Sequence, residues 1–428
     1  MGKRIRNNMN KTKIIPILIF LQGSLLSSCC KDSPKPPDLP TEFPTNLEVL
    51  WNAPFYSDED DYGWFLDYEI AKDEYIVLAN TSQKIGIYSI QTGERHPAWQ
   101  QNLFVYEFNH LNSCKVAGKN KDIILVYDSK SLFAYSLHNG QRLWSLSISN
   151  TGCPYMSADK DYAFISYGLS KSWYRLAMVD VSSGQKRDIL QLYAEDNYNI
   201  RINPPSAHVS SNGDTLLFFT TSGWNFSAVH GRVHAYCYNL TKKQMVWENK
   251  QFTTDTDAPA VQPPPFVIEN DKLIVTSMRA IHCFNKNTGE LIWQKEGLSF
   301  SDRPPLYYEG RLYIRYGDPG VLLCLDAQNG QQLWENTTLN TAVPSPNGRM
   351  AIYNGRLYFS AWGPDATHHL TCVDIQTGKE LWTDRGPYGW IAFGVLIDQK
   401  TGYLYCNTGG STLCVDLNKT PNGKKDKK

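Results

Sequence analysis

The sequence lacks an excess of charge of either sign. Its 428 residues include 42 Lys and Arg against 42 Asp and Glu, which argues against the basic surface of a nucleic-acid-binding protein. No stretch keeps the 3.6-residue period of an amphipathic helix, which disfavours crossover helices. Gly-x-Ser-x-Gly and phosphate-loop motifs are also absent. The apolar share of 42% nevertheless suits a globular protein with a substantial core.

Long hydrophobic runs are missing too. A basic head at residues 3–13 precedes the apolar run Ile14–Leu26, which is too short for a permanent membrane span and has the flanks of a secretory signal. "LSSC" at Leu26–Cys29 resembles a bacterial lipobox. It predicts a signal peptide at 1–28 and lipidation of Cys29; the alternative is an ordinary signal peptide that happens to contain cysteine. The remaining chain would carry 37 basic and 42 acidic residues.

The next segment is rich in proline, with five in residues 31–46. This composition favours an extended, semi-rigid spacer, so residues 29–46 are expected to be a lipid anchor and tether. The polar, basic residues 419–428 are expected to be a disordered tail. These features predict an outer-membrane lipoprotein on the periplasmic face or the cell surface, and the sequence does not decide between the two leaflets.

A thirteen-residue phrase recurs along the rest of the chain. It reads "IHCFNKNTGELIW" at 281–293, "LLCLDAQNGQQLW" at 322–334 and "LTCVDIQTGKELW" at 370–382. Successive copies are separated by 47, 44, 59, 46, 41, 48 and 42 residues, a period typical of β-propellers and solenoids. The turn position of the phrase is occupied by Gly93, Gly140, Gly184, Lys243, Gly289, Gly330, Gly378 and Thr420.

Each phrase has the pattern of a β-hairpin. Alternating apolar and polar residues flank a Thr-Gly or Asn-Gly turn, where glycine accommodates positive φ. Two further strands precede each phrase, so we expect four antiparallel strands per repeat, which is a propeller blade. The closing tryptophans are expected to dock against neighbouring blades, and they are Trp51, Trp99, Trp144, Trp247, Trp293, Trp334 and Trp382.

The ends of the repeat region complement each other. The last copy, "TLCVDLNKT", stops before its fourth strand, and Asn46–Trp51 supplies a strand with no hairpin before it. Pairing the two would close the ring and remove both open sheet edges. We therefore predict an all-β fold, an eight-bladed propeller over residues 47–418. The third copy, "VDVSSGQKRDIL", has no tryptophan, and its interface is expected to be weaker.

The phrase Cys/Ala-x-Asp-x-x-Thr/Asn-Gly-x-x-x-Trp resembles the tryptophan-docking repeat of the pyrroloquinoline-quinone (PQQ)-like propeller family. With the lipobox, the chain resembles the lipoprotein subunit of the outer-membrane β-barrel assembly machinery. The family also includes quinoprotein dehydrogenases, which typically carry a vicinal disulfide, Ca²⁺ ligands and an Asp base. Here the only adjacent cysteines are Cys29 and Cys30, and Cys-x-x-Cys-His is absent. We therefore expect no cofactor, although carboxylates could form a Ca²⁺ site that sequence does not reveal.

No catalytic or metal-binding constellation emerges. His368 and His369 are adjacent, so on a strand they would point to opposite faces, and the acidic run at 58–61 lacks the spaced ligands of a calcium loop. Five cysteines share one repeat position in five blades and are expected to be core residues; they are Cys237, Cys283, Cys324, Cys372 and Cys414. The sequence does not decide whether Cys114 and Cys153 form a disulfide, but the distance expected between their strands disfavours one.

The remaining tryptophans define a candidate binding face. In a four-stranded blade, the loops between second and third strands and the loops between blades open on the same face. That face is expected to carry Trp64, Trp173, Trp224, Trp362 and Trp390, with Arg303 and Asp318 adding polar contacts. The alternative is that these indoles pack beneath loops, because large aromatic residues are mostly buried. Arg279 and Arg315 are placed on the same face.

The sequence thus favours a non-catalytic scaffold that binds an envelope protein or glycan, with a role in outer-membrane protein assembly implied by the resemblance. It would contact the membrane through its lipid alone and act as a monomeric propeller within a complex. The alternative is an enzyme, either a PQQ-dependent dehydrogenase or a glycan-active enzyme, that uses the propeller channel.

Overall fold

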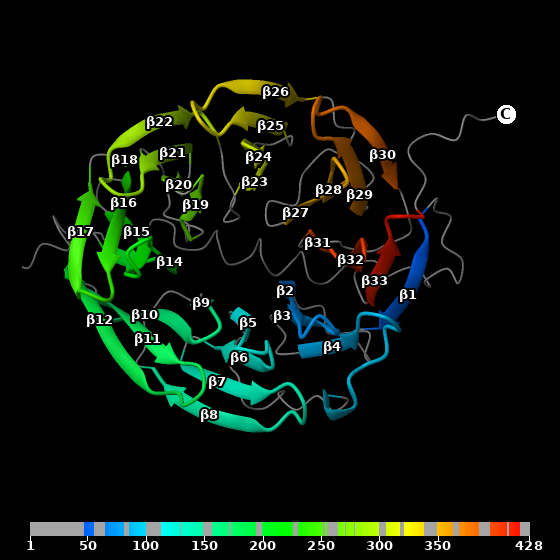
Figure 1. The fold of residues 1–428 in the computed structure, drawn as a ribbon, viewed down its shortest axis with the longest axis horizontal. Helices are drawn as coiled ribbons and strands as arrows, with labels where there is room; N and C mark the ends of the chain where they lie inside the picture. Colours follow the sequence, from blue (N-terminus) through cyan, green and yellow to red (C-terminus); the bar gives the residue numbers. More distant parts are fainter. Residues whose placement is uncertain are drawn as a thin grey trace, which may run out of the picture. The chain divides into compact units, whose positions relative to one another are not determined.

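Eight antiparallel sheets follow one another around a common axis in the computed structural model (Figure 1). The structure describes residues 47–54, 65–80, 85–99, 113–128, 130–148, 156–170, 173–193, 199–225, 230–250, 253–254, 264–269, 271–277, 279–298, 305–316, 321–337, 349–362, 368–384, 394–408 and 411–419. We number the sheets as blades 1–8 in chain order. The predicted all-β propeller of eight blades is confirmed.

Blades 1–4 occupy the first half of the ring. Blade 1 holds β2 (Phe65–Ala71), β3 (Tyr75–Asn80) and β4 (Ile85–Ser89), followed by the 3-10 helix η1 (Pro97–Trp99). Blade 2 holds β5 (Ser113–Ala117), β6 (Ile123–Tyr127), β7 (Ser131–Ser136) and β8 (Arg142–Ser147). Blade 3 holds β9 (Met156–Ala158), β10 (Tyr162–Ser170), β11 (Trp173–Asp180) and β12 (Lys186–Tyr193). Blade 4 holds β13 (Asn199–Ile202), β14 (Ser206–Val209), β15 (Thr215–Asn225), β16 (His230–Asn239), β17 (Gln244–Asn249) and β18 (Thr253–Thr254).

Blades 5–8 complete the ring. Blade 5 holds β19 (Phe266–Ile268), β20 (Lys272–Ser277), β21 (Ala280–Asn285) and β22 (Leu291–Glu296). Blade 6 holds β23 (Leu306–Tyr308), β24 (Arg311–Tyr316), β25 (Val321–Asp326) and β26 (Gln332–Asn336). Blade 7 holds β27 (Met350–Tyr353), β28 (Arg356–Trp362), β29 (His368–Asp374) and β30 (Glu380–Asp384). Blade 8 holds β31 (Val395–Asp398), β32 (Tyr403–Thr408), β33 (Ser411–Asp416) and the N-terminal strand β1 (Val49–Pro54).

The ring closes through the two ends of the propeller. Strand β1 pairs antiparallel with β33, with Trp51 opposite Cys414, and the Asp416 amide donates to the Glu48 carbonyl at 2.9 Å. The sheet order β1-β33-β32-β31 makes β1 the outer strand of blade 8. The predicted closure is confirmed, and it gives blade 8 the same four-stranded form as blade 7.

Two blades depart from the expected four strands among the described residues. Blade 1 has three, because a single bridge between Tyr88 and Arg95 replaces a fourth ladder. Pro97 follows two residues after Arg95 and lacks the amide hydrogen that a ladder needs, and the chain enters η1 there. Blade 4 has six strands, because the 11-residue β15 pairs with both β13 and β14, and β16 pairs with both β17 and β18.

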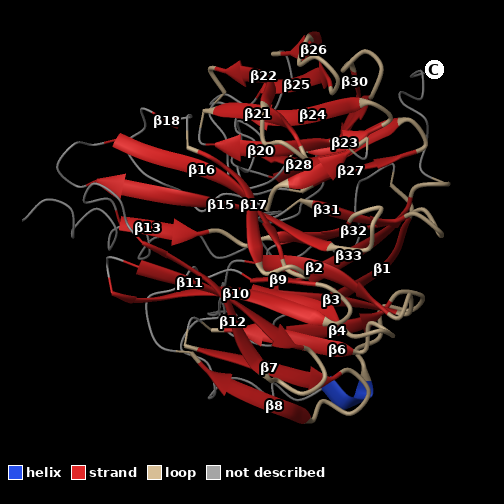
Figure 2. Ribbon diagram, turned by 60° about the vertical axis from the view of Figure 1, so that its left-hand side comes forward, coloured by secondary structure: helices blue, strands red, loops and turns tan. Residues whose placement is uncertain are grey.

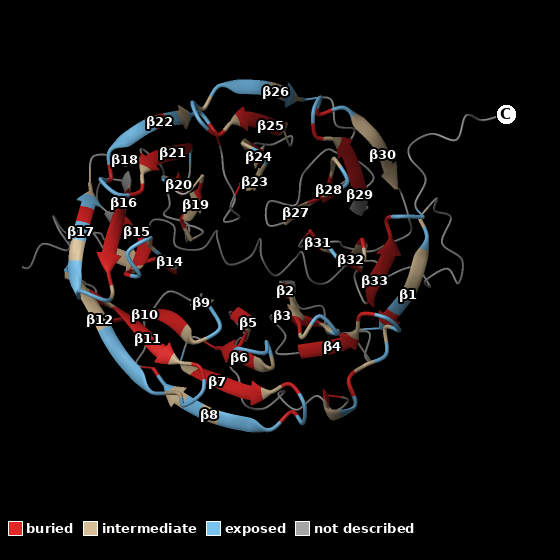
Figure 3. Ribbon diagram, viewed as in Figure 1, coloured by how far each residue is buried: buried red, intermediate tan, exposed pale blue. Residues whose placement is uncertain are grey.

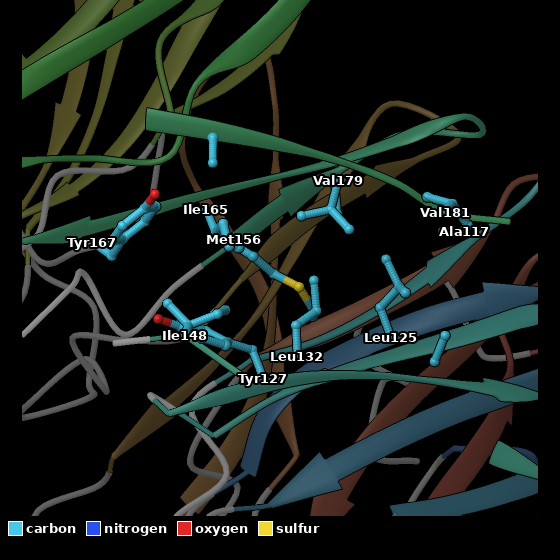
Figure 4. Close-up of a cluster of buried hydrophobic side chains, with 13 residues drawn as sticks. Ala117, Leu125, Tyr127, Leu132, Ile148, Met156, Ile165, Tyr167, Val179 and Val181 are labelled. Atoms are coloured by element: carbon cyan, nitrogen blue, oxygen red, sulfur yellow. The ribbon is translucent and has the colours of Figure 1, made fainter. Parts of the chain in front are cut away.

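The core lies in the layers between consecutive blades, which we call seams. Middle strands are largely buried, whereas outer strands such as β8, β22 and β26 are largely exposed (Figure 3). At the seam between blades 2 and 3, Leu125 and Leu132 pack against Ile165 and Val179, with Met156 among them (Figure 4). Each seam therefore has its own apolar core.

Six of the seven repeat tryptophans also bond across a seam. Each indole Nε1 donates to the backbone carbonyl three residues before the turn position of the next blade. The bonds join Trp51 to Ile90 (3.0 Å), Trp99 to Leu137 (2.7 Å), Trp144 to Val181 (2.8 Å), Trp247 to Lys286 (2.8 Å), Trp293 to Ala327 (3.2 Å) and Trp334 to Ile375 (3.1 Å). Each of these indoles thus buries ring surface in a seam while its Nε1 keeps a hydrogen-bond acceptor.

The turn glycine has a second role that the repeat pattern did not reveal. A Cβ on Gly330 would lie 2.6 Å from the Trp293 ring, and Gly93, Gly184, Gly289 and Gly378 are covered by indoles in the same way. Blade 3 sends no tryptophan to blade 4, and there the turn residue is Lys243, with a φ of 56°. Positive φ alone therefore does not demand glycine, whereas the indole stacked on the turn does.

The repeated cysteines are core residues, as expected. Cys237, Cys283, Cys324, Cys372 and Cys414 are fully buried and free of disulfides. Burial raises the pKa of Cys237, Cys283, Cys324 and Cys372 to about 12. Cys114 is likewise buried, whereas Cys153 lies outside the described residues, so a disulfide between the two stays untested.

The indole stacked on Gly330 leads to a prediction about two equivalent turns, those at Gly330 and Lys243. Gly330→Ala should lower the free energy of unfolding by about 2–4 kcal/mol, because the methyl group overpacks the Trp293 ring and meets positive φ. Lys243→Ala, at a turn without an indole, should change it by no more than about 0.5 kcal/mol. Urea denaturation followed by tryptophan fluorescence measures both. Equal losses at the two positions would show that the indole does not set the requirement.

The raised pKa values predict that the buried cysteine thiols react slowly with thiol reagents. In the native protein at pH 8, the described cysteines should resist a disulfide exchange reagent, because the thiolate is the reactive form and access is blocked. In denaturant all of them should react within minutes. Rapid labelling of Cys324 in the folded state, mapped by peptide mass, would contradict the buried position.

Candidate functional site

The sector of blades 3 and 4 differs most from the repeat. Strands β15 and β16, of 11 and 10 residues, form the longest hairpin of the described chain, and Figure 2 shows it extending beyond the neighbouring blades. Strands β13 and β18 pair along its far half. This sector therefore presents extra surface that the other blades do not have, on the side of the loops between second and third strands.

The seam between these two blades is built without a tryptophan. In blade 2 the outer-strand bulge places Trp144 opposite Ala134, whereas in blade 3 the bulge falls two positions later and Asp188 lies opposite Ala177. Ile189 and Leu190 instead pack with Tyr236 and Tyr238 of blade 4. Tyr and aliphatic side chains thus fill the space that an indole fills elsewhere.

A cavity of about 240 Å³ opens along the same seam. One wall is the end of β12, with Gln191, Leu192 and Tyr193. The other wall comes from blade 4 and is lined by Ile200, Thr221, Gly223, Arg232, His234, Tyr236, Glu248 and Lys250. Polar and charged residues thus outnumber aliphatic ones in the lining of this cavity, in contrast to the apolar seam beneath it.

A second polar group covers the opposite face of β12. The Arg175 guanidinium stacks over the Trp173 ring, 5.0 Å from its centroid, and its Nη1 donates to the Asp188 carboxylate at 2.9 Å. The Tyr167 hydroxyl donates to the same carboxylate at 2.5 Å, and Lys186 Nζ donates to Tyr167 at 2.7 Å. Although burial opposes the charge, the hydroxyl and the two cations hold the pKa of Asp188 below its usual value.

Of the predicted binding face, Trp173 is the residue whose side chain the structure describes. It begins β11, directly after the connection from the second strand of blade 3. Trp224 is the next-to-last residue of β15 and Trp362 is the last residue of β28, and their side chains lie outside the description. Trp64, Trp390, Arg303, Asp318 and Cys29 fall outside the described residues. The face as a whole thus stays a prediction.

Arg315 has a different role from the surface contact expected of it. Its guanidinium lies over the Phe359 ring, 4.9 Å from the centroid, and donates to the Ser360 carbonyl at 2.9 Å. Burial lowers its pKa to about 9. Arg315 therefore joins blades 6 and 7, while Arg279 is exposed as expected.

Sequence reasoning missed the cavity, although a signal was present. The third phrase lacks its tryptophan and the following turn lacks its glycine, so both halves of one seam deviate together. Among the described residues, no group of three or more His, Cys, Asp or Glu side chains could hold a metal ion. The acidic run at 58–61 and Asp365 lie outside them. In the same part of the chain, no helix is long and apolar enough to cross a membrane.

Curated proteins match this chain over short segments. Tetrathionate hydrolase of Acidianus ambivalens is 28% identical over 137 residues, covering 26% of this chain and 24% of the enzyme. Quinohemoprotein alcohol dehydrogenase of Comamonas testosteroni is 23% identical over 137 residues, covering 28% of this chain and 19% of the enzyme. The chain thus spans about a quarter or less of the length of these relatives.

A solved structure matches over nearly the full propeller. BamB from Moraxella catarrhalis superposes with a TM-score of 0.59 at 14% identity, covering 87% of this chain and all of that one. At this identity the likeness concerns the fold. The model of the family described as outer membrane protein assembly factor BamB matches residues 48–263 and 230–389. Because these segments include well over half of the sequence, the chain belongs to this family.

Proposed function

We propose that this protein is a non-catalytic, lipid-anchored scaffold that binds a protein partner during outer-membrane protein assembly. The observation that carries the proposal is the family match over residues 48–389. The superposition on BamB covers the whole of that chain, whereas the matched enzymes share about a quarter of their length or less. This chain therefore shares only a segment of repeats with the enzymes. A propeller fold by itself does not specify an activity.

The partner would bind the face that carries Trp173 and the extended β15–β16 hairpin. Aromatic and arginine side chains dominate protein-binding hot spots, and here Arg175 lies on the Trp173 ring at 5.0 Å. The bonds from Arg175 to Asp188 and Gln191 hold the pair in one geometry, so little side-chain freedom is lost on binding. Trp64, Trp224, Trp362 and Trp390, with Arg303 and Asp318, would extend this face towards other blades.

Site-specific photocrosslinking tests the face. A photoreactive residue at position 173 in the full chain, expressed in its own cells, should give an adduct with one outer-membrane protein. The matched control is position 119 on the exposed turn between β5 and β6, on the opposite face of the ring, where no adduct is expected. Equal adducts at both positions, or none at 173, would reject the proposed face.

Substitution at the same place separates binding from stability. Trp173→Ala should reduce partner recovery several-fold while changing the Tm by no more than about 2 °C. A fall of the Tm by about 5 °C or more would show instead that the indole is a packing residue. Trp293→Ala, at a seam, is the comparison that should lower stability.

The anchor is tested separately. Cys29→Ser should move the protein from the membrane fraction to the soluble fraction, because the lipid on Cys29 would be its only attachment to the membrane. Retention of Cys29→Ser in outer membranes would contradict lipid anchoring.

A quinone-dependent enzyme is the second candidate, favoured by the match to the alcohol dehydrogenase. Addition of PQQ with Ca²⁺ distinguishes the two functions. A scaffold should show no stoichiometric quinone absorbance after gel filtration, whereas a tight one-to-one complex would support the enzyme.

A further inference from the structure

The seam between blades 4 and 5 carries a charged side chain where the repeat is otherwise apolar. The carbonyl that accepts the Trp247 indole belongs to Lys286. Lys286 is only 7% exposed, although lysine is almost never fully buried unless it is paired. The other seven copies of the repeat have an apolar residue at this position, and these are Ile90, Leu137, Val181, Leu240, Ala327, Ile375 and Leu417.

The side chain of this lysine contacts a histidine of the neighbouring blade. Lys286 Nζ lies 3.1 Å from Nε2 of His208 on β14. An ammonium group has donors and no acceptor, so His208 accepts at Nε2 and carries its ring proton on Nδ1. The contact therefore requires a neutral imidazole, because a protonated ring would present an N–H group to the ammonium.

The surfaces around the pair are mainly apolar. The Phe218 ring lies beside His208, with 6.5 Å between the centroids, and Phe218 packs with Leu216 and Cys237 in the core of this seam. Burial raises the pKa of Cys237 to about 12, so this thiol stays neutral. In such surroundings a second positive charge beside the Lys286 ammonium is costly.

The same seam contains a second histidine. His282 lies two residues before Phe284 on β21 and stacks on its ring, with 6.0 Å between the centroids, so it faces blade 4 as Phe284 does. Burial lowers the pKa of His282 to about 4. Because His208 is half-buried and His282 is fully buried, His208 is the histidine that is protonated first as the pH falls.

The acidic residues beside these strands have other surroundings. Asp214 Oδ2 lies 2.6 Å from Lys242 Nζ, and Glu269 Oε2 lies 2.5 Å from Lys272 Nζ. Asp271, which precedes β20, has an exposed side chain. Protonation of His208 therefore adds its charge directly against Lys286.

We infer that the contact between His208 and Lys286 is an acid-sensitive latch, which holds blades 4 and 5 together at neutral pH and loosens their seam when His208 is protonated. Lys286 also provides the carbonyl for Trp247 at 2.8 Å, so its displacement disturbs two contacts of the seam. The inference is independent of the scaffold function, because these groups lie within the ring and need no partner.

The direction of the pH dependence follows from the surroundings of His208. Burial, and then the charge of Lys286, lowers the pKa of His208 below its usual value of 6.5. The unfolded chain therefore takes up this proton more readily than the folded protein does. The stabilisation is complete above about pH 6.5 and is lost as the pH falls through the lower pKa of the folded state.

Hydrogen exchange of the full chain in detergent, followed by mass spectrometry, tests the latch. His208→Gln keeps an acceptor for Lys286 and removes the titration. In peptides that contain β14 and β21, wild type and His208→Gln should exchange at equal rates at pH 7.5. At pH 5.0 the wild type should exchange at least about fivefold faster in these peptides, whereas β25 of blade 6 should exchange equally in both.

Two further variants complete the test. Lys286→Met introduces the apolar character of the other copies and should reduce the acid response of the wild type by at least about half. His138→Gln is the matched control, because His138 Nε2 contacts Lys72 Nζ at 2.6 Å in an exposed position, and it should respond like the wild type at β14 and β21. Lys286→Met remains informative if His208→Gln fails to fold.

Three outcomes would each overturn the inference. The first is equal exchange of wild type and His208→Gln at pH 5.0. The second is a full acid response in Lys286→Met. The third is an acid-induced loss of protection that is the same in all eight blades, which would show general unfolding in place of a seam that opens.

Discussion

The contact between an outer-strand indole and the turn of the next blade is the interaction on which the ring depends. It combines three features at each complete seam, namely a stacked ring, a turn glycine without Cβ, and a bond from Nε1 to a carbonyl. At the Trp293 seam these are the close approach to Gly330 and the 3.2 Å bond to Ala327. The same three features occur together at the seams of Trp51, Trp144, Trp247, Trp293 and Trp334.

The exceptions follow the same rule. Blade 3 has no tryptophan, and blade 4 has Lys243 in place of glycine. At the seam between blades 7 and 8, the turn position is Thr420, and the buried Trp382 Nε1 has no hydrogen-bond partner among the described residues. Within the described part of the chain, the indole whose facing turn lacks glycine thus also lacks the acceptor that the other seams provide. The first exception leaves room for a polar cavity, and the second lies beside the blade that closes the ring.

Most of the architecture could be predicted from the sequence because the repeat encodes local hairpins. The turn glycines, the cysteine positions and the truncated last copy were sufficient for eight blades and their closure. The departures depended on tertiary context. Pro97 removes an amide from blade 1, and the length of β15 gives blade 4 extra pairing, which no periodicity reveals. Arg315 was expected at the surface because its strand position alone does not show that Phe359 of the next blade covers it.

The candidate site was less accessible to sequence reasoning. Trp173 could be placed on a face by topology, but its stacking partner Arg175 and the bond to Asp188 depend on the displaced bulge of β12. The cavity lies along the same seam, and its two walls come from segments that are far apart in sequence, such as 191–193 and 232–236. A missing tryptophan indicated where to look without showing what would replace it.

Strand β1 is synthesised before any other part of the propeller, and its partner β33 is synthesised last. The strand β1 therefore has no pairing partner until almost the whole chain has been synthesised. Closing a loop of this length is entropically costly and slow, and an exposed edge strand invites association with other chains. Shielding of Val49–Pro54 until Ser411–Asp416 is available should consequently favour closure of the ring over association with other chains.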